Sequence, residues 1–550
     1  MKNRLCSLAI RPSPRISAWL AACALVVTAA TAAADAPDWL RAQLSAPLPP
    51  HDEKTNAVEL YRESVLTVQP DGRLKSLERV ALRILRPEGE SLGLVRRSFD
   101  AQSPITAIHG WSIPAQGKIY EVKGKNALES AVYGVDGSVL VTDVQSKLLQ
   151  IPAAQPGNVI GYEIEQVMRP YMAGDTWDFH ETVPVREAHY TLQLAPSWDY
   201  RALWINSEPV APVGGGPGRW RWTVNNLAAI RPERDMPPWE GIAGRMAVAL
   251  IPPATQAPGI NSWSDLATWY YNLARERRTA TPAIQEKVSA LTAGEPTLLG
   301  KMRVVSAFVQ NDVRNVAIKL GSGGHQPHPA GEVFTNRYGD CKDKATLLST
   351  MLKQLGVDSH LVVINTTRGS INAATPPYLG FDHMILAIEL PADLKDPSLL
   401  ATVQHPKFGR LLFFDPTDRL TPFGSLSGSL QANFGLVTGA EGGGLVELPQ
   451  LRGETNGVQR VAKMNLDAKG VLRGEVHDFR NGDSAAQQRY LLRSSTLDTD
   501  RIKPVEELAA ASLSTFRILK ATIANLQETQ KPFEWIYSLE VTTTPKSPAA

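Results

Sequence analysis

Alternating apolar and polar residues dominate the chain from residue 50 to about residue 250. The segments "VELYRESVLTV" and "LERVALRIL" alternate on either side of a "PDG" turn at residues 70–72, a pattern that predicts a β-hairpin. Similar short runs follow: "GKIYEV", "SVLVTDV", "NVIGYEIEQV", "AHYTLQL" and "RWRWTV". Many short strands separated by frequent turn signals predict a β-sandwich over residues 50–250.

The periodicity becomes helical after a proline-rich link at residues 251–262. "SWSDLATWYYNLARERR" begins with capping candidates, and "TPAIQEKVSAL" has Thr281 as its predicted N-cap before Pro282. A third predicted helix, "TLLGKMRVVSAFVQNDV", places four apolar residues on one face: Leu298, Met302, Val305 and Val309. "NVAIKL" then predicts a short strand, and "GSGGHQPHPAGE" predicts a loop.

A fourth predicted helix begins at Cys341. Four residues repeat on one face, and Gly356 ends the pattern. The repeating residues are Ala345, Leu348, Leu352 and Leu355. Asp340 is well placed as the N-cap, so we expect Cys341 in the first turn of this helix.

Residues 450–550 predict a C-terminal β-rich region. "VAKMNLDAKGVLRGEVHDF" has a two-strand pattern, "VEELAAASLSTFRIL" predicts a helix, and "EWIYSLEVTTTPKSPAA" predicts a strand that runs into a tail. A second β-domain fits this order, either complete or incomplete within the chain.

Composition changes this picture little. A chain of 550 residues is expected to form two or three domains. The balance of 57 basic against 55 acidic residues, without a basic stripe, argues against nucleic acid as a partner.

The first 34 residues predict an export signal. Basic residues precede the apolar run "ISAWLAACALVVTAA", and "TAAADAP" supplies small residues before a cleavage site at Asp35. Two alternatives remain open, lipidation at Cys23 and an uncleaved membrane anchor. No other segment could cross a membrane, so we expect a periplasmic or extracellular protein, membrane-attached if this segment is retained or lipidated.

Cleavage before Asp35 would remove Cys6 and Cys23 and leave Cys341 as a lone thiol. Unpaired cysteines are commonly oxidised in exported proteins, so a retained thiol favours a chemical role. The N-terminal end of a helix stabilises a thiolate, and its N–H groups can bind an oxyanion. The alternative is that Cys341 is a small buried apolar residue.

A thiolate nucleophile needs a histidine to transfer protons and an acceptor that orients the ring. His383 opens the predicted strand "HMILAIEL", and Asp415 ends the predicted strand "RLLFFD". Neighbouring strands beside a helix N-terminus could bring the three side chains together. As isolated residues, His383 and Asp415 also fit a strand-end histidine and a turn former.

The segments "YGDCKDKATLLSTMLKQLGVDSHLVVINT", "FDHMILAIEL" and "FFDPTD" together resemble the core of the bacterial transglutaminase-like superfamily. The resemblance covers about residues 265–420. It implies a papain-like α+β core at residues 262–425, with Cys341 as nucleophile, His383 as general base and acid, and Asp415 as orienting carboxylate. The preceding β-rich region is similar to the uncharacterised module that often precedes this core. The expected fold class is therefore a multidomain α+β protein.

The resemblance leaves some roles open. Gln310 or Asn311 is a candidate for side-chain support of the oxyanion, and Asp418 is an alternative to Asp415. There is no acidic cluster of the kind that binds calcium in animal transglutaminases, so neither a metal nor a cofactor is implied. His325 and His328 in "HQPH" have a ligand-like spacing, but they fit a loop lining the cleft better than a zinc site.

The expected function is acyl transfer or hydrolysis at amide bonds through a thioester, as in a peptidase, an amidase or a protein cross-linking enzyme. The expected substrate is a protein or peptide of the cell envelope. The alternative is a non-catalytic envelope binding or assembly protein with an unused enzyme-like core.

Overall fold

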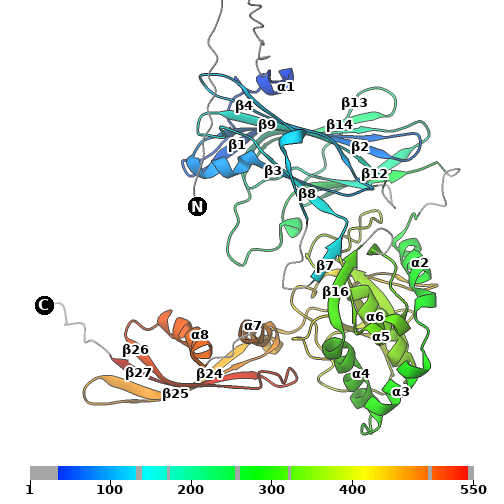
Figure 1. Ribbon diagram of the computed structural model, residues 1–550, viewed down its shortest axis with the longest axis vertical. Coiled ribbons are helices and arrows are strands. Elements are labelled where there is room, and N and C mark those ends of the chain that lie inside the picture. Colours follow the sequence, from blue (N-terminus) through cyan, green and yellow to red (C-terminus); the bar gives the residue numbers. More distant parts are fainter. Residues whose placement is uncertain are drawn as a thin grey trace, which may run out of the picture.

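The computed structural model describes residues 35–131, 139–169, 174–253, 260–319, 324–493 and 498–542. The predicted export signal at residues 1–34, including Cys6 and Cys23, lies outside these ranges. Figure 1 shows three parts in chain order: a β-rich N-terminal module, a central core of helices around a sheet, and a C-terminal domain coloured orange to red.

The N-terminal module is built on one large sheet with the strand order β13-β14-β11-β1-β2-β9-β4-β5. Its strands are β1 (Ala57–Val68), β2 (Leu74–Ile84), β4 (Ile105–Ile113), β5 (Tyr120–Lys123), β9 (Val159–Met168), β11 (Val185–Gln193), β13 (Val213–Gly214) and β14 (Arg219–Leu227). One smaller sheet contains β10 (Gly174–Asp178), β15 (Arg245–Ile251) and β12 (Asp199–Ile205). The other contains β3 (Leu94–Phe99), β8 (Gln145–Gln150) and β6 (Leu128–Ala131).

The two smaller sheets cover different halves of the large sheet. One buried cluster joins Leu66 and Tyr190 of the large sheet to Trp177 and Met246 of the β10-β15-β12 sheet. A second cluster joins β2, β4 and β9 to the β3-β8-β6 sheet. A third buried cluster contains Leu40 of the short helix α1 (Asp38–Arg41) and residues of β1, β2, β4 and β9. The alternation along these strands therefore corresponds to real burial, and the predicted β-rich N-terminal region is confirmed.

The central core has a six-stranded sheet with the order β20-β21-β19-β18-β22-β23. Its strands are β18 (Ser359–Ile364), β19 (His383–Leu390), β20 (Thr402–His405), β21 (Gly409–Phe414), β22 (Phe434–Val437) and β23 (Gly444–Glu447). The helices are α2 (Trp263–Ala274), α3 (Pro282–Thr292), α4 (Leu298–Asp312), α5 (Ala330–Asn336) and α6 (Cys341–Lys353). Helix α6 lies against β18 and β19, and α3, α4 and α5 pack around it.

The helix caps in the core agree with the sequence pattern. The Ser262 hydroxyl accepts the Asp265 N–H at the start of α2, and the Thr281 hydroxyl accepts the Ile284 N–H at the start of α3. Each cap satisfies an N–H group that the helix itself leaves without a partner.

Two segments differ from the prediction. Helix α5 begins inside the predicted "GSGGHQPHPAGE" loop, because Ala330, Val333 and Phe334 are buried in the core cluster despite the neighbouring glycine and prolines. The helix predicted across "VEELAAASLSTFRIL" ends at Ala510, and Phe516 starts a strand that pairs with the last strand of the chain. In both places tertiary packing overrides the local pattern.

The C-terminal domain is a four-stranded sheet with two helices. The sheet order is β24-β25-β27-β26, from β24 (Val458–Leu466), β25 (Val471–Arg480), β26 (Phe516–Ala524) and β27 (Phe533–Thr542). The helices are α7 (Gly482–Leu492) and α8 (Asp498–Ala510). None of the helices in the described ranges is long and apolar enough to cross a membrane.

The N-terminal module and the core share a small parallel sheet. Strand β7 (Val139–Thr142) pairs with β16 (Arg314–Lys319), and the N-terminal end of β16 pairs with β17 (Tyr338–Gly339). Figure 1 shows β7 and β16 side by side at the junction. Because β17 directly precedes Asp340 and Cys341, the module supports the strand pair that leads into α6.

Candidate active site

The start of α6 is defined by a reciprocal capping box. The Asp340 carboxylate accepts the Asp343 N–H at 3.3 Å, and the Asp343 carboxylate accepts the Asp340 N–H at 3.2 Å. The capping box uses the N–H groups of Asp340 and Asp343 and does not use those of Cys341 and Lys342. Cys341 is the free cysteine of the described residues; it is partly exposed and packs against the core cluster.

Adjacent strands bring His383 and Asp415 together. His383 is the first residue of β19, and Asp415 directly follows β21, the antiparallel neighbour of β19. Leu386 pairs with Phe414, so Asp415 lies near the start of β19. His383 Nε2 lies 2.8 Å from Asp415 Oδ2. The N–H and the hydroxyl of Thr417 donate to Asp415 Oδ1, each at 2.7 Å, so both carboxylate oxygens are held.

The charges around His383 favour its protonated form. Burial lowers the pKa of this imidazole, but the charge and hydrogen bond of Asp415, with a further hydrogen bond to the Cys341 sulfur, raise it well above its usual value. Because His383 Nε2 is hydrogen-bonded to Asp415, we infer that His383 Nδ1 faces the Cys341 thiol.

The two candidate carboxylates are in different environments. Burial raises the pKa of Asp415, but His383 and Thr417 outweigh this effect and lower it below its usual value. Asp418 instead accepts the Leu420 N–H at 2.8 Å and the Thr421 hydroxyl within its own turn. It is therefore Asp415 that is hydrogen-bonded to His383, and Asp418 shapes the following loop.

The two side chains proposed as oxyanion support have different surroundings. Gln310 is buried, and its amide nitrogen donates to the backbone carbonyls of Asp418 and Thr421, which uses both of its N–H groups. Asn311 is exposed at the end of α4. Gln310 thus ties α4 to the loop after Asp415, and the expectation of an oxyanion donor at this side chain is not met.

The first turn of α6 contains buried charged residues that the sequence pattern did not indicate. Lys342 forms an ion pair with Asp340, and the exposed fraction of each residue is no more than 3%. Lys344 is fully buried, and its ammonium donates to the Val313 carbonyl at 2.8 Å and the Gln310 carbonyl at 3.2 Å. These contacts join α6 to the end of α4. Burial is the main cause that lowers the pKa of Lys344 to about 8.

The Lys344→Met variant is expected to change the pH dependence of stability. A buried lysine with a pKa near 8 binds fewer protons than the unfolded chain between pH 8 and about 10.4, so the native state gains relative stability as pH rises through this window. The unfolding free energy of the wild type minus that of Lys344→Met should therefore increase by on the order of 3 kcal/mol between pH 8 and about 10.4. Urea unfolding of both proteins at several pH values measures this difference, and parallel curves would contradict it.

Aromatic side chains of α2 form a wall beside Cys341 that was not predicted. Tyr270 is 4% exposed; burial raises the pKa of its phenol above its usual range, with Cys341 as the second cause. The Tyr270 ring centroid lies 4.8 Å from Trp269, 6.3 Å from His325 and 6.5 Å from Phe381. The aromatic run "WYY" was the signal in the sequence, but helical periodicity alone assigns such residues to the core.

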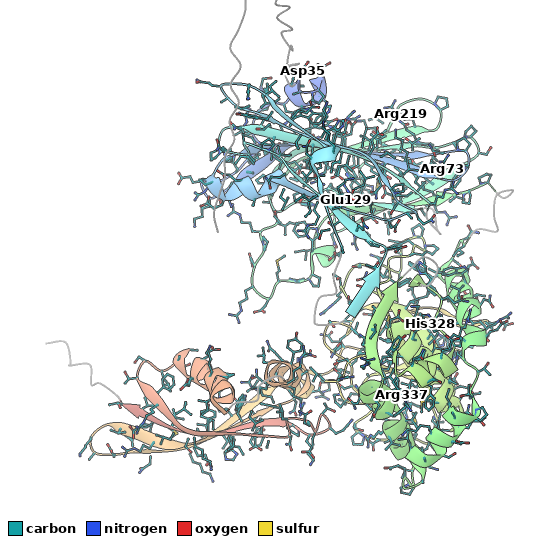
Figure 2. The ribbon with its side chains drawn as sticks, viewed as in Figure 1. Asp35, Arg73, Glu129, Arg219, His328 and Arg337 are labelled. Carbon is teal, nitrogen blue, oxygen red and sulfur yellow. The ribbon has the colours of Figure 1, made fainter. Side chains whose placement is uncertain are left out.

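The two histidines of "HQPH" have separate environments. His328, labelled in Figure 2 within the core domain, contacts Asp343. Its Nδ1 lies 3.1 Å from Asp343 Oδ2, and its backbone N–H donates to Asp343 Oδ1 at 2.8 Å. His325 lies beside the rings of Trp269 and Tyr270. Among the described residues, no group of three or more acidic, histidine or cysteine side chains could hold a metal ion.

Comparison with known proteins identifies two family matches. Residues 70–231 match the domain of unknown function DUF3857, and residues 285–378 match the transglutaminase-like superfamily. The second match includes Cys341 and ends before His383 and Asp415. No curated protein matches the chain.

Two solved structures illustrate the range of structural similarity. A "putative protease" from Parabacteroides distasonis is 12% identical, with a TM-score of 0.53, and the alignment covers 89% of this chain and 94% of that one. An M1 zinc metallopeptidase from Deinococcus radiodurans is 10% identical over 37% of this chain and 43% of that one, with a TM-score of only 0.19. The first likeness shows a shared fold, and the second carries no weight.

Proposed function

Because this chain carries a transglutaminase-like domain behind a DUF3857 module, we propose that it is an exported cysteine enzyme that cleaves or transfers acyl groups at amide bonds. The observation that carries the proposal is the hydrogen bond between His383 and Asp415 beside a free thiol at a helix N-terminus. A thiol, an imidazole and an orienting carboxylate in this order are the groups that thioester chemistry requires.

In the first step the Cys341 sulfur attacks the carbonyl carbon of an amide as a thiolate. The carbonyl π bond opens, and the oxygen becomes an anion, which the N–H groups of Cys341 and Lys342 are placed to stabilise. When the carbon–nitrogen bond breaks, the His383 imidazolium gives its Nδ1 proton to the leaving amine. The product of this step is a thioester on Cys341 and a free amine.

In the second step His383 acts as a base. It takes a proton from water or from a second amine, and the resulting nucleophile attacks the thioester carbonyl. The carbon–sulfur bond breaks, and the thiolate is regenerated beside the imidazolium. Water gives a carboxylic acid, and an amine gives a new amide bond, so one site serves hydrolysis or cross-linking.

Asp415 contributes by holding the ring. Its hydrogen bond to Nε2 keeps Nδ1 directed at the thiol and stabilises the imidazolium, and Thr417 keeps the carboxylate in place. With the export signal predicted at residues 1–34, proteins or peptides of the cell envelope are the proposed substrates.

Alkylation of Cys341 tests the proposal. We expect iodoacetamide at pH 7 to modify Cys341 at least about ten times faster than the thiol of a short unstructured peptide, because the thiolate is paired with an imidazolium. Mass spectrometry of the modified peptide measures the rate. A rate equal to that of the free thiol, or modification only after unfolding, would instead favour a non-catalytic envelope protein.

A further inference from the structure

A cleft of about 440 Å³ lies between the N-terminal module and the core. Its walls come from four segments that are distant in the sequence: strands β10 and β15 of the module, and His325 and residues 376–379 of the core. The cleft is therefore formed only when both domains are present.

The module contributes small and uncharged side chains to the cleft. Thr176 pairs with Ala247 and Gly174 pairs with Ala249, so these four residues share one face of the β10-β15 pair. Asp175, which also lines the cleft, accepts a hydrogen bond from the buried Tyr190 hydroxyl at 2.8 Å. The carboxylate is thus engaged inside the module.

The core contributes a wall that is held in place from both sides. It consists of Pro376, Pro377, Tyr378 and Leu379. The Tyr378 hydroxyl donates to the Ser370 carbonyl, and the Trp263 indole donates to the Thr375 carbonyl at 3.0 Å. Arg245 of the module, which is 5% exposed, donates to the Gly369 carbonyl. The loop that leads to His383 is therefore fixed partly by the module.

The cleft lies near the candidate active site. His325 lines the cleft, and its ring lies 6.3 Å from Tyr270 of the core cluster. Leu379, which also lines the cleft, and Cys341 both pack against this same cluster. The four-residue wall ends at Leu379, four positions before His383.

We propose that this cleft binds the substrate chain next to the scissile amide, as an extended peptide segment with small, uncharged side chains. The inference rests on the proposed function and deepens it by assigning a substrate class and by giving the module a direct role in binding. In this arrangement the DUF3857 module supplies one wall of the substrate site.

The shape and chemistry of the walls favour a peptide over other amides. β10 is an edge strand that pairs only with β15 among the described residues, so its outer main-chain groups suit an extended chain. The lining side chains are mostly small or apolar; Asp175 and His325 are the acidic and histidine residues among them, and Asp175 already accepts the Tyr190 hydroxyl. A charged substrate side chain would lose hydration in a cleft that offers few partners for an ion pair.

A bulky substitution in the cleft separates substrate binding from thiol reactivity. Thr176 is exposed on β10, so Thr176→Trp adds volume to the cleft without disturbing a buried position, and tryptophan suits a strand. The matched control is Val213→Trp, at a position of β13 that is 74% exposed and does not line the cleft. Equal melting temperatures establish that both variants are folded.

The probes are small and peptidyl forms of the same electrophiles. Chloroacetamide is compared with chloroacetyl-Ala-Ala-Ala amide, and chloroacetone with the chloromethyl ketone of acetyl-Ala-Ala-Ala, so that the peptide extends on either side of the reacting carbon. Versions with glutamate or lysine as the middle residue test the preference for uncharged chains. The second-order rate constant for modification of Cys341 is measured for each probe.

We expect the wild type and Val213→Trp to react faster with at least one alanine probe than with its small counterpart. Thr176→Trp should lower that peptidyl rate about tenfold or more and leave the small-electrophile rates within about twofold. The charged probes should react more slowly than the alanine probe.

Two results would overturn the inference while leaving the proposed function intact. One is a peptidyl rate in Thr176→Trp equal to that of the wild type, and the other is a wild type that reacts no faster with either alanine probe than with its small counterpart. If chloroacetamide modifies wild-type Cys341 no faster than a free peptide thiol, the proposed function itself fails, and the inference fails with it.

Discussion

Replacing Cys341 with alanine is expected to abolish turnover, with a loss of about 10⁴-fold or more relative to the wild type. The thioester cannot form without the sulfur, and what remains is the contribution of substrate binding and oxyanion stabilisation. Activity is measured as hydrolysis of a peptide library by mass spectrometry and, in parallel, as incorporation of a fluorescent primary amine into the same peptides. The ratio of hydrolysed peptide to amine-labelled peptide shows whether water or an amine resolves the thioester.

The Cys341→Ser variant is the conservative control. It keeps the shape of the site but replaces the thiol with a hydroxyl that ionises far less readily, so it should retain little or no turnover while folding normally. Both variants should unfold at nearly the wild-type temperature, because Cys341 is only partly buried and does not hold the helix cap. Wild-type turnover in Cys341→Ala would remove Cys341 from the mechanism.

Replacing His383 with alanine should reduce turnover by about 10²- to 10⁴-fold, because the leaving amine then departs without a proton donor. Thiol alkylation at pH 7 should fall as well, since the imidazolium that stabilises the thiolate is lost. The matched control is His360→Ala. His360 is another half-buried histidine, on the neighbouring strand β18, and its Nε2 lies 2.8 Å from the Glu389 carboxylate. That variant should keep wild-type turnover, and an equal loss in both would indicate a general effect on folding.

The pH dependence of turnover tests the protonation state of His383 directly. Its pKa is raised well above about 6.5, so the imidazolium persists at neutral pH, and wild-type turnover should decline only as pH rises through that higher value. The same raised pKa stabilises the fold below pH 6.5, and this contribution is lost as pH rises through the native pKa. His383→Ala should lack the alkaline decline in turnover and the corresponding loss of stability. A wild-type decline centred near pH 6.5 would contradict the charge arrangement around His383.

The α6 region was predictable because its determinants are local. Asp340 as N-cap, Cys341 in the first turn and the apolar face from Ala345 to Leu352 all belong to one helix, where residue spacing fixes the direction of each side chain. The strands around His383 and Asp415 were likewise readable from continuous apolar runs. Their adjacency was only a permitted arrangement, since many strand orders are compatible with the same runs.

Other features depended on contacts that no local pattern records. The Gln310 amide is used by the loop at residues 418–421, and Lys344 is buried against the end of α4. Both side chains would be ordinary exposed residues on an isolated helix. Helix α5 formed inside a segment rich in glycine and proline because its apolar residues found a place in the core.

By itself, the sequence determined the β-rich module, the capped helix that begins at Cys341, and the identity of the residues that could partner the thiol, because strand alternation, helix periodicity and capping act over a few residues. Only the tertiary structure decided which carboxylate reaches His383, where the side chain of Gln310 points, and that the N-terminal module forms one wall of the cleft. Those results depend on strand order and on packing between segments that lie from 32 to more than a hundred residues apart, and side-chain periodicity carries no information over such distances.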